Sequence, residues 1–114
     1  MKNTNDEQVY LLLREGCPVD YTQNIISSKW KSIILWHLSQ RIWRFNELQR
    51  ILSPISKGIL TRQLRELEED GMVHREVYKA VPPKVEYSLT EKGMSFVPIL
   101  RLMGEWGVKN RDSI

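Results

Sequence analysis

The chain has 114 residues, 41% of them hydrophobic and 27% charged, with a formal net charge of +3. This length fits one compact domain, and this composition is that of a globular protein, which excludes a disordered tail. The polar N-terminus lacks the apolar core of a secretory signal, no apolar run could span a bilayer, and the single cysteine excludes an internal disulfide framework. We therefore expect one domain over residues 1–114, located in the cytoplasm.

The amino-terminal part of the chain predicts two short helices. The first covers about residues 6–14 and ends at Gly16. The second begins at Pro18, because proline suits the first turn of a helix. Its inward positions repeat at helical spacing at Val19, Thr22, Ile25 and Ile26.

Helical spacing continues through the next two segments. Residues 29–39 carry a stripe wide enough to face a core, formed by Trp30, Ile33, Ile34, His37 and Leu38. Leu35 and Trp36 lie off this stripe, so the helix should contact neighbours on two sides. After a short link, a further core helix is predicted over residues 44–52, with inward positions Phe45, Leu48 and Leu52. Ser53-Pro54 then breaks the chain.

The helix with the best-defined ends is predicted over residues 56–70. Ser56 can cap its N-terminus, and Ile55 and Leu60 match a hydrophobic staple around that cap. Gly71 follows as the left-handed residue that ends many helices. The core-facing positions are Ile59, Leu60, Leu64 and Leu67.

Beyond Gly71 the apolar period changes from 3.6 to 2, which predicts two strands. Residues 79–84 connect them as a projecting tip that two prolines stiffen. Thr90 then caps a last helix over residues 91–109, which Pro98 should kink or split. Its apolar set is Phe96, Val97, Leu100, Met103, Trp106 and Val108. The fold class is therefore mainly α with a small β-hairpin.

The order helix, helix, tight turn, helix, hairpin is the winged helix-turn-helix plan, in which residues 56–70 would enter the major groove of DNA. The exposed positions near the start of this helix are small, polar or basic: Ser56, Lys57, Gly58, Thr61, Arg62 and Arg65. Arg62 can make a two-pronged contact to guanine, whereas Ser56 and Lys57 suit phosphates. We expect the acids at the other end to be held away from DNA, namely Glu66, Glu68, Glu69 and Asp70.

The charge distribution supports this interpretation, because eleven basic residues face six acidic ones between Lys29 and Lys84. Arg44 belongs to the expected DNA-binding set, and Lys79 and Lys84 flank a hairpin tip that would lie near the adjacent minor groove. One alternative is an ordinary solvated surface with incidental lysines on the hairpin. The other is a winged-helix protein-interaction module that does not bind DNA.

Short segments between about Cys17 and Gly107 also carry a family resemblance in their order and spacing. They are Cys17-Pro18-Val19, Lys29-Trp30, Arg44-Phe45-Asn46-Glu47-Leu48, Leu60-Thr61-Arg62-Gln63-Leu64, Leu67-Glu68-Glu69-Asp70-Gly71, Pro82-Pro83-Lys84-Val85-Glu86-Tyr87 and Leu89-Thr90-Glu91-Lys92-Gly93. Together they resemble the HxlR-type regulators, relatives of the MarR class. The resemblance implies a winged helix, operator binding as a homodimer, and dimerisation through the terminal helices. The tip Lys79-Ala80-Val81 departs from the more acidic or neutral tips expected of that family.

The apolar residues of the terminal helices predict a dimer independently, because they exceed what one small core can cover. We expect segments 6–16 and 91–109 to pair across a two-fold axis through Val9, Leu12, Leu13, Phe96, Leu100, Met103 and Trp106. Such a homodimer would bind a palindromic operator with half-sites about 34 Å apart and would repress or activate nearby genes. The alternative is that these helices pack only on their own domain.

Cys17 immediately precedes Pro18, so it should lie at a helix N-terminus, where the helix dipole favours the thiolate that a redox or electrophile sensor needs. The resemblance implies the same role, because several HxlR-type regulators sense such signals through a cysteine at this motif position. The alternative is a buried small hydrophobe.

The sequence offers little support for catalysis. His37 falls on the apolar stripe, His74 has no paired nucleophile nearby, and one cysteine with two distant histidines matches no usual metal spacing. We therefore expect a protein that is not an enzyme and that needs no metal and no cofactor.

Overall fold

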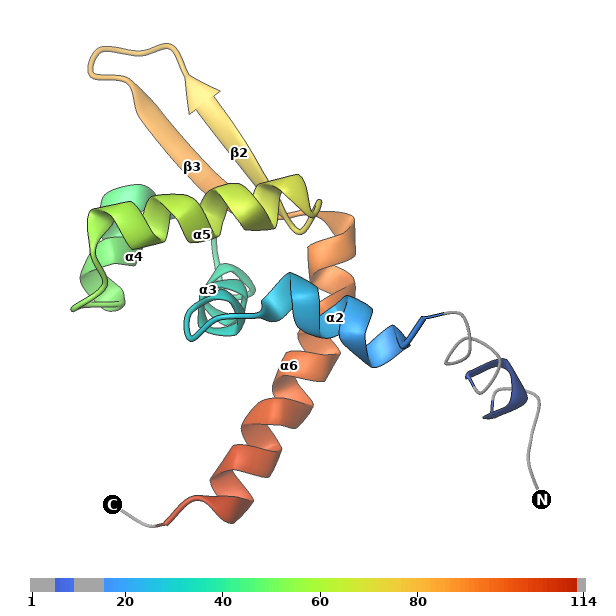
Figure 1. Cartoon of the computed structure of the whole chain (residues 1–114). Helices are drawn as coiled ribbons and strands as arrows, with labels where there is room; N and C mark the ends of the chain where they lie inside the picture. Colours follow the sequence, from blue (N-terminus) through green and yellow to red (C-terminus); the bar gives the residue numbers. More distant parts are fainter. Residues whose placement is uncertain (1–5, 10–15, 113–114) are drawn as a thin grey trace.

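The computed structural model describes residues 6–9 and 16–112 as a mainly helical domain with a three-stranded antiparallel sheet (Figure 1). Its elements are α2 Pro18–Ile26, α3 Lys31–Leu38, β1 Trp43–Arg44, α4 Phe45–Ile51, α5 Lys57–Glu69, β2 Val73–Tyr78, β3 Lys84–Leu89 and α6 Glu91–Asn110. This is the winged helix-turn-helix order, with α4 and α5 as the helix pair and β2–β3 as the wing. Residues 6–9 are helical, and the rest of the helix expected over 6–14 lies outside the described residues. Among the described helices, none combines the length and hydrophobicity that a membrane span requires.

The sheet contains a strand that the sequence did not predict. Trp43 and Arg44 form β1, which pairs with Tyr87 and Glu86 of β3, so the strand order is β1-β3-β2. The expectation of a two-stranded hairpin was therefore incomplete, and the helix expected over 44–52 begins at Phe45. A strand of two residues has no apolar period of its own and is visible only through its pairing.

The hydrophobic core is centred on α5. Its residues Leu60, Leu64 and Leu67 are buried, as predicted, against buried residues of α3 and α4. The expectation was wrong for Ile59, which is 39% exposed. Gln63 takes the fourth inward position at 4% exposure, where its amide oxygen accepts a hydrogen bond from Ser28 Oγ at 2.7 Å.

The inward face of α3 is rotated from the predicted stripe. Leu35 is fully buried beside Ile34, whereas Ile33 and Trp36 are exposed. The cause is that α3 packs against α5, β3 and α6, so the side that meets the core runs through Lys31, Ile34, Leu35 and Leu38. Ile33 and Trp36 lie on the side that faces the C-terminal half of α6.

Hydrogen bonds connect the end of α5 to the start of α6, although the wing separates the two helices in the sequence. Gly71 adopts a φ of +76°, and the backbone N–H groups of Gly71 and Met72 donate to the carbonyls of Glu68 and Leu67, which closes the helix as a Schellman motif. The residue before α6 forms hydrogen bonds with the same turn: Thr90 Oγ1 donates to the Gly71 carbonyl, and the Thr90 N–H donates to the Met72 carbonyl. A Cβ at Gly93 would overlap that Met72 carbonyl oxygen, so this close approach requires glycine.

Helix α6 runs unbroken through Pro98, so the expected split does not occur. Pro98 has no N–H to donate to the carbonyl of Met94, and both residues lie on the exposed side of the helix, where water can solvate that carbonyl. The C-terminal half of α6 extends away from the other labelled elements (Figure 1).

Candidate nucleic-acid interface

Helix α5 is fixed by its N-cap and its leucine face. Ser56 Oγ accepts a hydrogen bond from the backbone N–H of Ile59 at 3.1 Å, as the sequence predicted. Because successive helical residues turn by about 100°, burial of Leu60, Leu64 and Leu67 directs the opposite face to solvent. That outward face carries Gly58, Arg62, Arg65 and Glu69, and all four are exposed.

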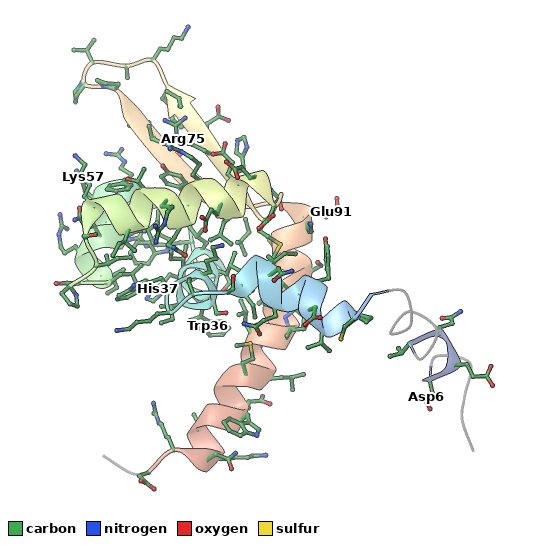
Figure 2. The ribbon with its side chains drawn as sticks, viewed as in Figure 1. Asp6, Trp36, His37, Lys57, Arg75 and Glu91 are labelled. Atoms are coloured by element: carbon green, nitrogen blue, oxygen red, sulfur yellow. The ribbon has the colours of Figure 1, made fainter. Side chains whose placement is uncertain are left out.

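A groove of about 420 Å³ separates α5 from the sheet. From α5 it is lined by Lys57, Thr61, Arg65 and Glu68, and from the sheet side by Phe45, Arg75, Val85 and Tyr87. Figure 2 shows Lys57 at the start of α5 and Arg75 on the wing above that helix. Arg75 was absent from the predicted DNA-binding set, although strand alternation places it on the same face as Val73 and Val77.

A second hollow brings Arg44 and Lys84 together where the start of α4 meets β3, with Asn46 and Pro83 beside them. The Lys84 ammonium lies 3.9 Å from Glu86 Oε2 and 4.6 Å from the centre of the Tyr78 ring. The negative charge of Glu86 also raises the pKa of Tyr78. Lys79, at the other end of the wing tip, is exposed and does not line this hollow.

The position of Arg44 is set by the residues around the start of α4. Glu47 Oε1 accepts a hydrogen bond from the Arg44 backbone N–H at 2.8 Å, and this bond is the main reason why the pKa of Glu47 is lowered. The Arg41 guanidinium lies 3.5 Å from the centre of the Trp43 ring and 3.3 Å from the same carboxylate. These contacts hold the link before α4 in place.

The acidic residues near the end of α5 point in different directions. Glu66 turns toward α3, where its carboxylate lies 2.8 Å from the ammonium of Lys31, a residue that is only 4% exposed. The hydrogen bond and charge of Lys31 lower the pKa of Glu66, with a smaller contribution from Arg62. Glu68 lines the groove beside Arg65 and Arg75. The helix face that each acid occupies therefore decides its surroundings, in addition to its place near the end of α5.

The hydroxyl of Thr61 is already engaged. Thr61 Oγ1 donates to the Lys57 carbonyl at 2.8 Å, so the side chain offers its methyl group and oxygen lone pairs to the groove.

Cys17 lies at the N-cap position of α2 and is partly buried. Its carbonyl accepts from the N–H of Tyr21 at 3.1 Å. The Tyr21 hydroxyl in turn accepts from Lys92 Nζ at 3.0 Å, and Lys92 also donates to the Asp70 carbonyl at 2.9 Å. Helix α2, which Cys17 precedes as N-cap, is therefore linked by hydrogen bonds to the end of α5.

The predicted dimer residues divide into two groups. Met103, Trp106 and Val9 are exposed, whereas Phe96 and Leu100 belong to the protomer's own core. The apolar pattern did not distinguish these two sides of α6, and it missed the exposed Ile99 and Leu102. Leu12 and Leu13 lie outside the described residues.

A hollow of about 650 Å³ lies between α3 and α6 and is lined mainly by apolar atoms. Ile33 and Trp36 contribute from α3, and Met103 and Val108 contribute from α6. Within the described ranges, no three metal-ligating side chains are grouped closely enough to hold an ion.

Comparison with known proteins places these features in a family. The model of the HxlR-like helix-turn-helix family matches residues 25–114. The HTH-type transcriptional regulator YybR of Bacillus subtilis is 57% identical over 99 residues, which cover 87% of this chain and 79% of that protein. The solved structure of the redox regulator HypR in its oxidized form is 56% identical, with a TM-score of 0.81 over 85% of this chain and 100% of that one. The reduced form of the regulator YodB from B. subtilis is 30% identical, with a TM-score of 0.74 over 84% and 95% of the two chains.

The Lys31–Glu66 pair generates a stability prediction. Glu66→Gln should lower the urea midpoint of unfolding near neutral pH, because it leaves the buried Lys31 ammonium without its counter-charge. Lys31→Met, which removes the buried charge, should be better tolerated, and the double variant should recover most of the loss. Because the folded-state pKa of Glu66 is lowered, the wild-type advantage should be present above the ordinary value of 4.5 and disappear as the pH falls through the lowered pKa. Equal midpoints for wild type and Glu66→Gln at neutral pH would contradict this account.

Proposed function

The chain belongs to the HxlR-like helix-turn-helix family of transcriptional regulators, and we propose that it binds DNA as a homodimer with α5 in the major groove. The observation that carries this proposal is the outward face of α5, where Gly58, Arg62 and Arg65 stand opposite a fully buried leucine row. A helix so held presents small and basic groups to a base edge while its other side anchors it to the core. In this proposal the protein acts by binding DNA rather than by catalysis, and it is located in the cytoplasm.

The side chains of α5 have different roles in this proposal. Arg62 lies on the outward face and reads a guanine through its two-pronged guanidinium. A Cβ added at Gly58 meets no atom within 4 Å, so glycine here leaves room for close approach of the DNA. Thr61 presents its methyl group, which suits the methyl of thymine. Ser56 and Lys57, at the start of the helix, contact phosphates.

The wing adds contacts at the neighbouring minor groove. Lys79 makes such a contact from the exposed tip of the wing. Arg44 and Lys84 form a second basic point next to the start of α4. Since Lys84 already contacts Glu86 and the Tyr78 ring, its contribution is smaller than that of Lys79.

The dimer is proposed from the free half of α6. Ile99, Leu102, Met103 and Trp106 follow the i, i+3, i+4, i+7 spacing of a helix-pairing stripe, and every one of them is exposed. Trp106 is 70% exposed and Leu102 is 64% exposed, which is costly for large apolar side chains unless a partner covers them. A second copy of this chain would cover them symmetrically and would match a palindromic operator.

A redox or electrophile response is proposed for Cys17. Two relatives have solved structures in a defined redox state, HypR in its oxidized form and YodB in its reduced form. Cys17 is the one cysteine of this chain, so a disulfide can form only with another molecule. In that reaction the thiolate attacks a disulfide, one S–S bond breaks, a mixed disulfide forms and one thiol leaves. A modified Cys17 would act on α5 through α2, Tyr21 and Lys92.

The DNA-binding proposal predicts a specific loss for Arg62→Ala. On a duplex selected from a random pool, the variant should bind more weakly by about 1–3 kcal/mol and should lose preference at one base pair of each half-site. Fluorescence anisotropy on single-base variants of the duplex measures both effects, and the exposed C-terminal Arg111→Ala provides the control. An equal loss on every sequence would reassign Arg62 to a phosphate. Salt-indifferent binding by the wild type would overturn the DNA function and favour a protein-interaction module.

The dimer proposal predicts that Leu102→Glu with Trp106→Glu gives a folded monomer. Two charges in an apolar helix pair should raise the dimer dissociation constant about thirtyfold or more. Sedimentation equilibrium measures the change, and circular dichroism checks that the helices remain. Met94→Glu is the matched control, because Met94 is exposed on α6 but lies off the stripe. A dimer that tolerates the double change would rule out this interface.

The sensing proposal predicts that a quinone-type electrophile changes DNA affinity several-fold in the wild type and leaves Cys17→Ser unaffected. The thiolate forms an S–C bond with a ring carbon, one quinone oxygen takes a proton from water, and the other takes the proton lost from that ring carbon, which gives a hydroquinone adduct. Mass spectrometry counts the adduct, and anisotropy on the selected duplex measures the affinity. An identical response in Cys17→Ser would exclude Cys17 as the sensor.

A further inference from the structure

Arg75 occupies an unusual position on the wing. The β2–β3 register places Val73 opposite Leu89, Arg75 opposite Tyr87 and Val77 opposite Val85. These six residues share the face of the sheet that is turned toward α5, because side chains alternate along a strand. Arg75 is the one charged residue among them, in a row where the other five are apolar or aromatic.

The groove in front of Arg75 carries positive charge that the described part of the chain does not neutralise. Lys57, Arg65 and Arg75 line it together with a single acid, Glu68. Among the described residues, the ion pairs within 4 Å are Lys31–Glu66, Arg41–Glu47, His74–Glu76 and Lys84–Glu86. None of them involves the three cations of the groove. A hollow of about 420 Å³ with three unpaired cations suits an anion.

The position of the groove identifies the anion. If α5 lies in a major groove and the wing tip reaches the adjacent minor groove, the sugar–phosphate strand between those two grooves must pass between α5 and the wing. That space is the groove lined by Lys57, Arg65 and Arg75. We infer that this groove binds the phosphodiester strand that separates the two DNA grooves, with Arg75 as its contact from the wing side. The inference rests on the proposed DNA-binding function and adds a binding site to it.

The chemistry of the residues fits this role. The planar guanidinium of Arg75 matches two phosphate oxygens at once, and Lys57 supplies a mobile point charge from the other wall. Arg75 extends from a paired strand with Tyr87 as its cross-strand neighbour, so its backbone is held in register. Phosphate contacts of this kind fix the register of α5 without reading sequence themselves.

The test compares Arg75→Gln and Arg75→Lys with the wild type in duplex binding over a range of salt concentrations. For Arg75→Gln, the slope of log affinity against log salt should fall by about one unit, and low-salt affinity should drop about tenfold or more on every sequence alike. Arg75→Lys should keep the slope and lose less affinity, because it retains the charge but not the paired geometry. Arg111→Gln is the matched control for net charge. It removes the same charge as Arg75→Gln, but at the C-cap of α6. Melting curves establish that each variant is folded.

The results separate this inference from the function on which it rests. Salt-indifferent binding by the wild type would overturn the DNA function itself. A steep wild-type slope that Arg75→Gln leaves unchanged would overturn the phosphate site alone. A loss confined to one base pair would make Arg75 a base-reading residue, and this would also overturn it. Inorganic phosphate at constant ionic strength should not compete with the duplex, and competition that depends on Arg75 would assign the groove to a free anion instead.

Discussion

The hydrogen-bonded junction between the end of α5 and the start of α6 is the constraint on which the other functional parts depend. The carbonyls of Asp70, Gly71 and Met72 accept hydrogen bonds in succession from Lys92 Nζ, Thr90 Oγ1 and the Thr90 N–H. Thr90 Oγ1 also accepts from the Gly93 N–H, so the atom that caps α6 is the one that donates to the turn after α5. Gly93 allows the two chain segments to approach at this point. The first strand of the wing begins at Val73, the residue after Met72.

This junction fixes the angle between α5 and α6, the helix that carries the exposed apolar stripe. In a dimer that pairs through α6, the spacing of the two α5 helices is set by that angle and by the distance along α6. Tyr21 joins the same junction through Lys92, so α2 can act on α5 from its C-terminal end. A change at the N-terminus of α2 can therefore reach the end of α5 through Tyr21 and Lys92.

The sequence predicted those features whose cause is local. Ser56 and Gly71 mark the ends of α5 because capping and a left-handed φ involve only neighbouring residues. It did not predict β1, because Trp43 and Arg44 become a strand only by pairing with residues far along the chain. It placed Ile33 on the inward stripe and Leu35 off it, although the two lie on nearly opposite sides of α3, because the buried side depends on which elements surround that helix. Arg75 was missed for a related reason: alternation gives its face but not the open groove in front of it.

The acids of α5 show how tertiary contacts decide the electrostatics of a helix whose formal charges balance. Lys57, Arg62 and Arg65 face Glu66, Glu68 and Glu69 along Lys57–Glu69. Glu66 is held by the buried Lys31, one helical turn after Arg62, so its carboxylate is directed toward α3 rather than toward the outward face. Glu68 and Glu69 lie in the last turn of α5. The first two turns of α5 therefore contain the exposed cations Lys57 and Arg62 and no acid, although the formal charges of the whole helix balance.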